Sequence, residues 1–390
     1  MQAFKQRITS ALDKRRSGGL ERKIIDAEKG NSLDIHVDGK SYRNFSSNDY
    51  LGLANDIELV SAWQRGLSLY GAGSGSSPMV VGNCSAHSYL RAQLADWLGY
   101  EDTVLFNSGF SANQALIFAL MQKNDLLIQD RLNHASLIEA GSLCDATMKR
   151  FRHNDTRHLA TLLSSGSQPT LVLTEGVFSM DGDLAPLREI NETIKNKGLL
   201  AVDDAHGIGV LGGDGRGSID RAGIKPDILI ATFGKAFGLS GAAILCSREM
   251  ADYFSQFARH HVYSTAMPPS QAYTLSHAIK MIQTQQWRRD KLAELSLEYH
   301  RHMSDFESEC LPTITAIKPV VIGSSSLTVS AAKTMQASGI WTTAIRPPTV
   351  PHGAGRLRIT ITAGHDLNDI NLLCSSLSRV LEHVVTYERD

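Results

Sequence analysis

The stretch T-F-G-K-A-F-G-L-S-G-A, residues 232–242, places one lysine among glycines directly after the apolar run 227–231 (D-I-L-I-A). A short apolar run that leads into a glycine-containing turn predicts a buried strand. A buried ammonium group is costly to desolvate, and glycines contribute little packing. Lys235 therefore binds phosphate, supplies amine chemistry, or lies at a solvated turn, and the surrounding sequence has to decide between these.

Strand-like runs alternate with helical or glycine-rich segments through the middle of the chain. The expected strands are residues 103–106, 126–129, 148–151, 171–174, 199–203, 228–232 and 243–246. This alternation predicts an α/β fold with a mainly parallel sheet that is covered on both faces. Ligands of such sheets bind beyond the carboxyl ends of the strands, so polar residues at those positions are the site candidates.

The flanking regions predict a division into three parts. Residues 1–50 contain a helix whose apolar face we expect to dock, followed by a hairpin that turns at Asp38-Gly39. Residues 51–285 form the large domain, in which 71–82 read as a loop. Residues 286–390 form a smaller α+β domain. A long helix-like region, 268–310, leads into short strands near 320–322, 340–344 and 357–361.

Composition and charge exclude several classes of protein. The 390 residues carry a net charge of −1, which gives no global field to attract nucleic acid or an anionic membrane. No apolar stretch reaches the roughly 18 residues that a membrane span needs. The five cysteines form no C-x-x-C pair, so we expect no disulfide framework and no metal site, and we expect a cytoplasmic location.

Two phosphate-loop interpretations of the glycines fail. A Walker A motif requires glycine where Leu229 stands and Ser or Thr where Ala236 stands. The segment 207–212 (G-I-G-V-L-G) matches G-x-G-x-x-G, but the G-G-D-G-R-G that follows cannot start a stable helix, as a dinucleotide fingerprint demands. Both an ATP site and a nicotinamide or flavin site are therefore disfavoured.

Amine chemistry fits the remaining candidates better. Pyridoxal phosphate (PLP) requires a lysine imine, an acidic partner for the pyridine nitrogen and a phosphate anchor. Each candidate taken alone is more often a cap, a turn or a core residue, but their joint occurrence at strand ends favours a site. The candidates are Asp203 and His206 after one strand, His134 after another, Thr232 before the lysine, and Ser108, Gly109 and Phe110 opening a helix.

These motifs resemble the α-oxoamine synthase family of fold-type I PLP enzymes. The resemblance covers nearly the whole chain and implies the fold-type I architecture, with a large mainly parallel-sheet domain and a smaller α+β C-terminal domain. The segments that carry it are N-F-S-S-N-D-Y-L-G-L at 44–53, N-S-G-F-S-A-N-Q-A at 107–115, L-N-H-A-S-L at 132–137, T-E-G-V-F-S-M-D-G-D at 174–183, V-D-D-A-H-G at 202–207, T-F-G-K-A-F-G at 232–238, Y-S-T-A-M-P-P at 263–269, and A-I-R-P-P-T-V-P with R-L-R at 344–358.

The resemblance implies a role for each matching residue. Lys235 is similar to the Schiff-base lysine, Asp203 to the pyridinium partner and His134 to the residue stacked on the ring. Further cofactor contacts are implied for His206, Ser179, Thr232, Ser108, Gly109 and Phe110, and for Ser264 and Thr265, which would reach the phosphate of a neighbouring subunit in a homodimer. Substrate contacts are implied for Asn48 and Arg358 on the amino-acid carboxylate, for Thr349, and for Arg22 near the acyl group.

Within the family, the match is nearest to members that condense L-alanine with a pimeloyl thioester in biotin synthesis, releasing CO2 and a free thiol. The residues leave open whether coenzyme A or acyl carrier protein bears the pimeloyl group. Alternatives are a synthase that uses glycine or serine with another acyl thioester, a PLP aminotransferase, and a scaffold that has lost catalysis. The retained Lys235, Asp203 and His206 argue against the last of these.

Overall fold

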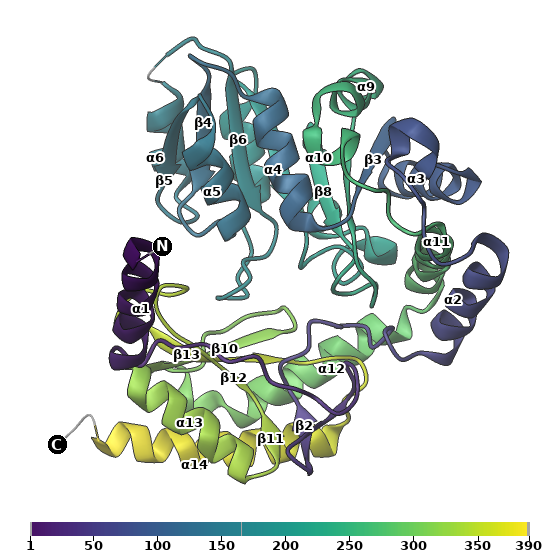
Figure 1. Cartoon of the computed structure of the whole chain (residues 1–390). Helices are drawn as coiled ribbons and strands as arrows, with labels where there is room; N and C mark the ends of the chain where they lie inside the picture. The colour runs from purple at the N-terminus through teal and green to yellow at the C-terminus, as the bar shows by residue number, and fades with distance from the viewer. Residues whose placement is uncertain (1, 165, 388–390) are drawn as a thin grey trace. The chain divides into compact units, whose positions relative to one another are not determined.

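A seven-stranded sheet organises the larger of the two units into which the chain folds (Figure 1). The computed structural model describes residues 2–164 and 166–387. The larger unit comprises 48–179 and 183–290, and the smaller unit comprises the described parts of 1–47, 180–182 and 291–390. The expected domain boundaries near residues 50 and 285 stay predictions.

The sheet of the larger unit is mainly parallel, as the sequence predicts. Its strand order is β3-β9-β8-β7-β6-β4-β5, and only β9 runs antiparallel to its neighbours. Every residue of β4, β8 and β9 is buried, so both faces are covered at these strands. The strands are β3 (Asp102–Phe106), β4 (Leu126–Asp130), β5 (Thr147–Phe151), β6 (Thr170–Glu175), β7 (Leu199–Asp203), β8 (Ile228–Thr232) and β9 (Ala242–Cys246).

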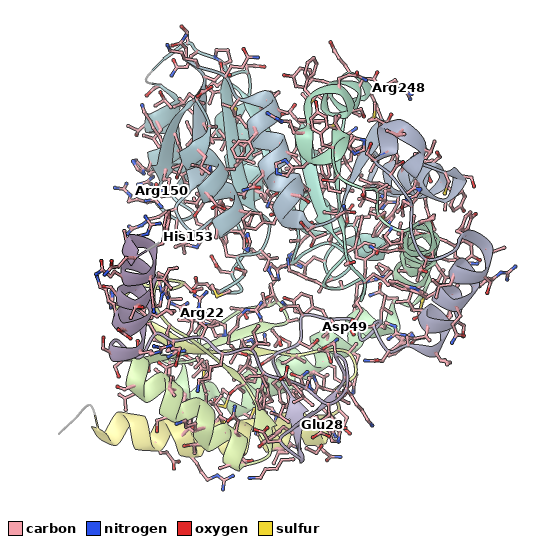
Figure 2. The ribbon with its side chains drawn as sticks, in the orientation of Figure 1. Arg22, Glu28, Asp49, Arg150, His153 and Arg248 are labelled. Carbon is pink, nitrogen blue, oxygen red and sulfur yellow. The ribbon has the colours of Figure 1, made fainter. Side chains whose placement is uncertain are left out.

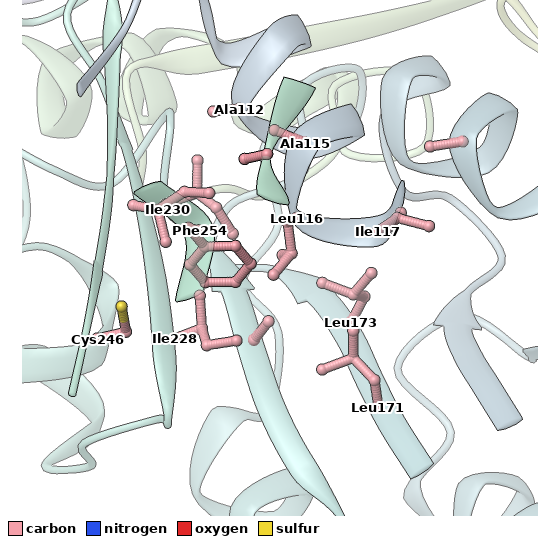
Figure 3. Close-up of a cluster of buried hydrophobic side chains, with 14 of the residues drawn as sticks. Ala112, Ala115, Leu116, Ile117, Leu171, Leu173, Ile228, Ile230, Cys246 and Phe254 are labelled. Atoms are coloured by element: carbon pink, nitrogen blue, oxygen red, sulfur yellow. The ribbon is translucent and has the colours of Figure 1, made fainter. Parts of the chain in front are cut away.

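Helices separate most of these strands and build the core with them. Figure 3 shows Ala112, Ala115 and Leu116 of α4 among buried side chains of β6 and β8. Because nearly all of these side chains are aliphatic, the helix and the sheet are joined by a dry, close-packed layer. The helices of this unit are α2 (Ile57–Tyr70), α3 (Ser85–Leu98), α4 (Gly109–Leu120), α5 (Ala135–Leu143), α6 (Thr156–Leu163), α7 (Leu187–Ile194), α8 (Ser218–Ala222), α9 (Arg248–Phe257), α10 (Arg259–Val262) and α11 (Pro269–Thr284).

In the described residues, two small sheets, the helices α1, α13 and α14, and most of α12 make up the smaller unit. The predicted hairpin is present: Asp38 and Gly39 both have positive φ, 50° and 70°, as a two-residue turn of this kind requires. The sheets have the orders β1-β2-β11 and β10-β13-β12. Their strands are β1 (Asp34–Val37), β2 (Lys40–Asn44), β10 (Ile317–Gly323), β11 (Ile340–Trp341), β12 (Thr343–Ile345) and β13 (Gly355–Thr360), and the helices are α1 (Gln2–Ser17), α12 (Trp287–His302), α13 (Ser325–Ala337) and α14 (Leu367–Tyr387).

Three local expectations are corrected. The helix α1 forms, but its apolar face does not dock within this chain, since Phe4 is 63% exposed and α1 has no buried residue. The helical region 268–310 is divided: α11 ends at Thr284, α12 spans Trp287–His302, and a 3-10 turn follows. The predicted loop 71–82 ends in a π-helical turn, Pro78–Gly82, in which proline takes the first position because a helix start needs no N–H there.

Candidate active site

A cavity of about 290 Å³ opens at the carboxyl ends of the parallel strands in the larger unit. Predicted site residues that are up to 187 positions apart in the sequence line this cavity together. They meet there because parallel strands end at the same edge of the sheet. Its lining residues are Asn48, Asn107, Ser108, Gly109, Phe110, Asn113, His134, Glu175, Asp203, Ala205, His206, Thr232, Gly234, Lys235, Ser240 and Gly241.

The loop after β8 fixes the position of Lys235. Phe233 and Phe237 on either side are fully buried and anchor the loop, while Lys235 is half-buried and lines the cavity. Gly238 has φ +66°, and a Cβ on it would lie 2.4 Å from the backbone nitrogen of Ala54. Close packing and backbone conformation therefore require glycine at position 238, whereas a Cβ on Gly234, directly before the lysine, would meet only ordinary contacts.

Asp203 ends β7 with its carboxylate buried and held from two directions. Oδ1 accepts from the backbone N–H of Ala205 at 3.1 Å. Oδ2 accepts from the side-chain amide of Asn113 at 2.7 Å. Because Asn113 lies on α4, this bond joins the helix to the end of the strand and sets the direction in which the carboxylate faces.

The imidazole of His134 is held in one tautomer. His134 caps the N-terminus of α5, and its Nδ1 accepts from the backbone N–H of Ser136 at 3.3 Å and lies 2.8 Å from the Ser136 hydroxyl. Burial lowers the pKa of His134, Asp203 opposes that shift, and Lys235 adds to it. The neutral ring consequently carries its proton on Nε2.

Asn113 connects the two groups just described. Its amide nitrogen donates to Ser136 Oγ at 3.0 Å as well as to Asp203. The ring of His134 and the carboxylate of Asp203 therefore share one buried network through Ser136 and Asn113.

His206 is joined to Asn48 by two polar contacts that both involve the Tyr50 hydroxyl. Its Nδ1 lies 2.7 Å from the hydroxyl of Tyr50, which donates to Oδ1 of Asn48 at 3.2 Å. Tyr50 is 1% exposed and His206 is 7% exposed, so the pair has little freedom to turn. Tyr50 thus links His206 to Asn48, a predicted contact of the amino-acid carboxylate.

The N-terminus of α4 presents backbone N–H groups to the cavity. Ser108 caps the helix by accepting from the N–H of Ser111 at 3.1 Å, and the Ser111 hydroxyl accepts from the N–H of Ser108. A Cβ on Gly109 would lie 2.7 Å from Cγ2 of Thr232, so only glycine allows this close approach. Such a helix start is a site for a phosphate group.

Glu175 adds a buried acid to the cavity. It ends β6 and is 2% exposed. Burial, with Asp203 nearby, raises its pKa well above the usual range, although Lys235 and the backbone N–H of His134 favour the ionised form. Burial therefore favours the protonated carboxyl group, which is the form able to donate a hydrogen bond.

The residues of the cavity fit PLP. Within residues 2–164 and 166–387, Thr232 Oγ1, Glu175 Oε1 and Asn113 Oδ1 are buried without a hydrogen-bond partner, and all three side chains line the cavity. Buried polar atoms normally have a partner, so a polar ligand accounts for them. The helix start suits a phosphate, Asp203 suits a ring nitrogen, and Lys235 suits an aldehyde.

Other predicted site residues lie elsewhere. In the described chain, Ser179 is not among the lining residues of this cavity. Ser264 and Thr265 line a different cavity of about 200 Å³ in the larger unit. In the smaller unit, Arg22 donates to Thr349 Oγ1 at 3.0 Å, and Arg358 is buried on β13.

Asn113, Tyr50 and Glu175 were not predicted. All three stand inside the quoted motifs, but each works through a partner far away in the sequence. The one available signal was position: Glu175 is the last residue of an apolar run, as Asp203 is.

The described chain contains neither a grouped set of metal-binding side chains nor a helix suited to span a membrane. Between residues 2 and 387, residue 165 apart, no three or more His, Cys, Asp or Glu side chains are grouped to hold a metal ion. In the same part of the chain, no helix has the length and apolar character needed to cross a membrane.

Comparison with known proteins gives consistent matches. Residues 40–377 match the family described as aminotransferase class I and II. The chain is 58% identical over 382 residues to an 8-amino-7-oxononanoate synthase of Vibrio parahaemolyticus, covering 98% of this chain and 99% of the relative. The corresponding protein of Vibrio cholerae is 57% identical over 385 residues, covering 97% and 98% of the two chains.

Solved structures show the same fold. Serine palmitoyltransferase from S. paucimobilis, with a bound PLP–myriocin aldimine, superposes with a TM-score of 0.90 at 25% identity, covering 97% of this chain and 98% of that one. An 8-amino-7-oxononanoate synthase from Francisella tularensis gives a TM-score of 0.78 at 26% identity, covering 90% and 99% of the two chains. The expected fold-type I architecture is therefore confirmed.

Proposed function

The chain belongs to the class I and II aminotransferase family and, within it, to the 8-amino-7-oxononanoate synthases, and from this premise we propose that the cavity around Lys235 is its active site. The protein is a PLP-dependent acyltransferase of biotin synthesis. Its reaction joins L-alanine to a pimeloyl thioester and releases CO2 and a free thiol. The observation that carries the assignment is the convergence of Lys235, Asp203, His134 and His206 on one cavity.

PLP, when bound, supplies an electrophilic aldehyde and an electron-withdrawing ring that stabilises negative charge at the α-carbon of the amino acid. Lys235 would hold the aldehyde end through Nζ. The backbone N–H groups of Gly109 and Phe110, with the Thr232 hydroxyl, would hold the phosphate end. Asp203 would keep a proton on the ring nitrogen, and Asn113 fixes the direction of that carboxylate.

Proton transfer falls to Lys235. Its amine, in the unprotonated form, is the general base that takes the α-proton of alanine. The α-carbon then forms a bond to the thioester carbonyl carbon, and the C–S bond breaks with the thiol as leaving group. Loss of the alanine carboxylate as CO2 and return of a proton to the same carbon complete the product.

His134 assists through its Nε2 proton. Because Ser136 occupies Nδ1, only Nε2 can donate to a substrate oxygen. A neutral donor at this position polarises the thioester carbonyl without adding charge to the cavity. The His134 ring is also the group that we assign to the face of the cofactor.

Substrate contacts are proposed for individual residues that match the family motifs. Asn48 and Arg358 are proposed to bind the alanine carboxylate, and Tyr50 orients Asn48. Arg22, hydrogen-bonded to Thr349, is proposed to contact the acyl substrate.

Ser179 is proposed as a further cofactor contact. We propose that Ser264 and Thr265 contact the cofactor phosphate of a second subunit, which makes the enzyme a homodimer. We also propose a cytoplasmic location, which the unpaired cysteines of the described chain favour.

A comparison of amino acids tests the assignment. The purified, PLP-loaded enzyme is assayed with pimeloyl coenzyme A and with alanine, glycine or serine, and both thiol and CO2 are measured. We expect alanine to give the highest kcat/KM and equal amounts of thiol and CO2. Preference for glycine or serine would identify a different oxoamine synthase, and amino-group transfer without thiol release would identify an aminotransferase.

A further inference from the structure

His153 stands where three neighbouring strands of the large sheet end. It lies two residues beyond the end of β5, where Figure 2 labels it. The neighbouring strand β4 ends at Asp130, and Asp183 belongs to the segment that follows β6, the next strand of the sheet. Because these strands are parallel, their carboxyl ends share one edge, which is the edge where the active-site cavity opens. The mechanism above gives His153 no role.

Both ring nitrogens of His153 face carboxylate oxygens. Nδ1 lies 3.0 Å from Oδ1 of Asp130, and Nε2 lies 2.8 Å from Oδ2 of Asp183. A carboxylate only accepts hydrogen bonds, so each nitrogen has to carry a proton, and the ring is a cation. Burial lowers the pKa of His153, but the two carboxylates outweigh burial and raise it to about 10. The ring also packs edge-on against the ring of Phe178, with the centroids 4.4 Å apart.

Asp130 anchors the turn that leads to His134, which we call the 130–134 turn. The side chain of Asp130 is fully buried, and Oδ1 also accepts from the N–H of Leu132 at 2.8 Å. The backbone oxygen of Asp130 accepts from the N–H of Asn133 at 3.2 Å. His134 is the next residue and caps α5. The position of Asp130 consequently sets the path of the chain into His134, which is assigned to the face of the cofactor.

Asp183 closes the base of the loop that carries Ser179, which we call the 177–184 loop. The backbone oxygen of Asp183 accepts from the N–H of Phe178 at 3.0 Å, and Val177 and Leu184 form an antiparallel bridge. Among the described residues, Oδ1 of Asp183 is buried with no hydrogen-bond partner. The charge of this carboxylate therefore depends on the partners of Oδ2.

Asn154 adds a second connection between the same two carboxylates. Its backbone N–H donates to Oδ2 of Asp130 at 2.9 Å, and its side-chain amide donates to Oδ2 of Asp183 at 2.8 Å. Its backbone is left-handed, with φ 55°, a conformation that asparagine tolerates better than most residues. His153 and Asn154 thus join the 130–134 turn to the 177–184 loop through one charged and one uncharged side chain.

We propose that His153 is a positioning residue for the reaction: by bridging Asp130 and Asp183, it holds the 130–134 turn and the 177–184 loop at a fixed spacing. The bond to Asp130 acts on His134, and the bond to Asp183 acts on Ser179. The proposal rests on the function assigned above, which gives His134 and Ser179 their roles. If the charges only stabilised the fold, the two bonds would be interchangeable, whereas here each bond has an effect of its own.

Two substitutions separate the bonds, because an amide nitrogen takes the place of Nδ1 in Asn and the place of Nε2 in Gln. His153→Asn keeps a donor toward Asp130 and loses the bond to Asp183. His153→Gln keeps a donor toward Asp183 and loses the bond to Asp130. Both variants replace the cation by a neutral amide, so the loss of charge affects them equally.

The two variants are expected to fail in different measurements. For His153→Gln, kcat at saturating PLP should fall by about tenfold, and the dissociation constant of PLP should change by less than about threefold. For His153→Asn, PLP should bind about tenfold more weakly, and kcat at saturating PLP should stay within about threefold of wild type. PLP affinity is measured by absorbance titration of the cofactor-free protein, and kcat by thiol release from pimeloyl coenzyme A with alanine.

Hydrogen exchange in the cofactor-free protein gives a measurement that does not depend on activity. His153→Gln should speed exchange at the N–H groups of Leu132 and Asn133, and His153→Asn should speed exchange at the N–H of Phe178. If both variants loosen both segments and change PLP affinity and kcat alike, His153 serves only the stability of the fold and the proposal is overturned. Wild-type behaviour of both variants would overturn it as well.

Arg152→Gln is the matched control, since it removes a neighbouring exposed cation that pairs with Asp155, and it should leave all three measurements unchanged. Asp183→Asn tests the second bond from its other partner. The side chain of Asp183 is 34% exposed, so this variant is expected to fold and to behave as His153→Asn does. In the double variant the two effects should not add, and strict additivity would contradict the bond's role.

Failure of the proposed function would look different. A wild-type enzyme that releases no thiol from pimeloyl coenzyme A with alanine would contradict that function. Hydrogen exchange and PLP titration would still separate His153→Asn from His153→Gln in that case, because neither measurement uses the acyl substrate.

Discussion

Asn113 on α4 donates to Oδ2 of Asp203 at the end of β7 across 2.7 Å, and both side chains are at least 96% buried. The same amide nitrogen also donates to Ser136, which is bonded to His134. The uncharged Asn113 thus orients two side chains. One is Asp203, which is assigned to the ring nitrogen of the cofactor, and the other is His134, which is assigned to the ring face.

Replacing Asn113 by Ala is expected to lower kcat by about ten- to a hundredfold, since a hydrogen bond to a charged group contributes roughly 1.5–3 kcal/mol. The pH profile of kcat/KM should also shift, because Asp203 and His134 lose a common neighbour. Gln114→Ala, one position further along α4, is the control and should behave as wild type. An unchanged rate and an unchanged pH profile would show that the network is only structural.

The Lys235→Ala variant is expected to fold but to give no detectable thiol release. Borohydride reduction, which attaches the cofactor to the wild-type protein, should leave this variant unmodified. Lys197→Ala, at an exposed position, should retain full activity and reducible cofactor. Turnover by Lys235→Ala would refute the role of its amine.

The Asp203→Asn variant is expected to bind PLP but to lose activity by about 10²-fold or more, because an amide does not keep the ring nitrogen protonated. Cofactor content is measured by absorbance, and rate by thiol release. Asp252→Asn, on an exposed face of α9, serves as the control. Wild-type turnover by Asp203→Asn would mean that another acidic residue pairs with the ring nitrogen.

Gly109→Ala is expected to weaken PLP binding by roughly tenfold, since the new methyl group meets Cγ2 of Thr232 and such overpacking costs about 1–3 kcal/mol. Thr232→Ser removes that methyl group and keeps the hydroxyl. Combining the two changes should therefore recover part of the lost affinity, measured by titration of the cofactor-free protein. Strict additivity of the two effects in this cycle would argue against the contact.

His365 predicts acid sensitivity in the smaller unit. Its ring stacks on Phe45 at 4.2 Å, and burial lowers its pKa to about 4 from the ordinary 6.5, opposed by a hydrogen bond to the Asn44 carbonyl. Between pH 6.5 and 4 the unfolded chain binds the proton more readily. Stability contributed by the neutral ring is therefore present above pH 6.5 and is lost as the pH falls, by up to about 3 kcal/mol.

Urea denaturation at pH 7.5 and pH 4.5 measures this effect. His365→Phe keeps an aromatic ring on Phe45 and should make the loss of stability on acidification smaller than in wild type. His352→Gln, at an exposed position, should not change it. An equal pH dependence in wild type and His365→Phe would contradict the assignment.

Local chemistry accounts for what could be predicted from the sequence. The sheet follows from apolar runs of strand length, the hairpin from Asp38-Gly39, and the cavity from the rule that parallel strands end at one edge. Lys235, Asp203, His134 and His206 were all found as polar residues at or just beyond such ends.

Long-range packing accounts for what could not be predicted. Tyr50 meets His206 from 156 positions away, and no local pattern reports that contact. The interruption between α11 and α12 falls at Gln285-Gln286, without glycine or proline to announce it. The spacing of the apolar residues predicts the helix α1, which is present. The same spacing does not show whether another part of the chain covers the apolar face of that helix.

The course of α4 has a consequence for how this chain can change over evolutionary time. One uninterrupted helix begins at Gly109 and carries Asn113 just over a turn later, so it fixes the distance between the proposed phosphate site and the residue that orients Asp203. Inserting a single residue between them would swing Asn113 by about 100° around the axis and away from Asp203. We expect this interval to tolerate exchanges of amino acids but no change in length.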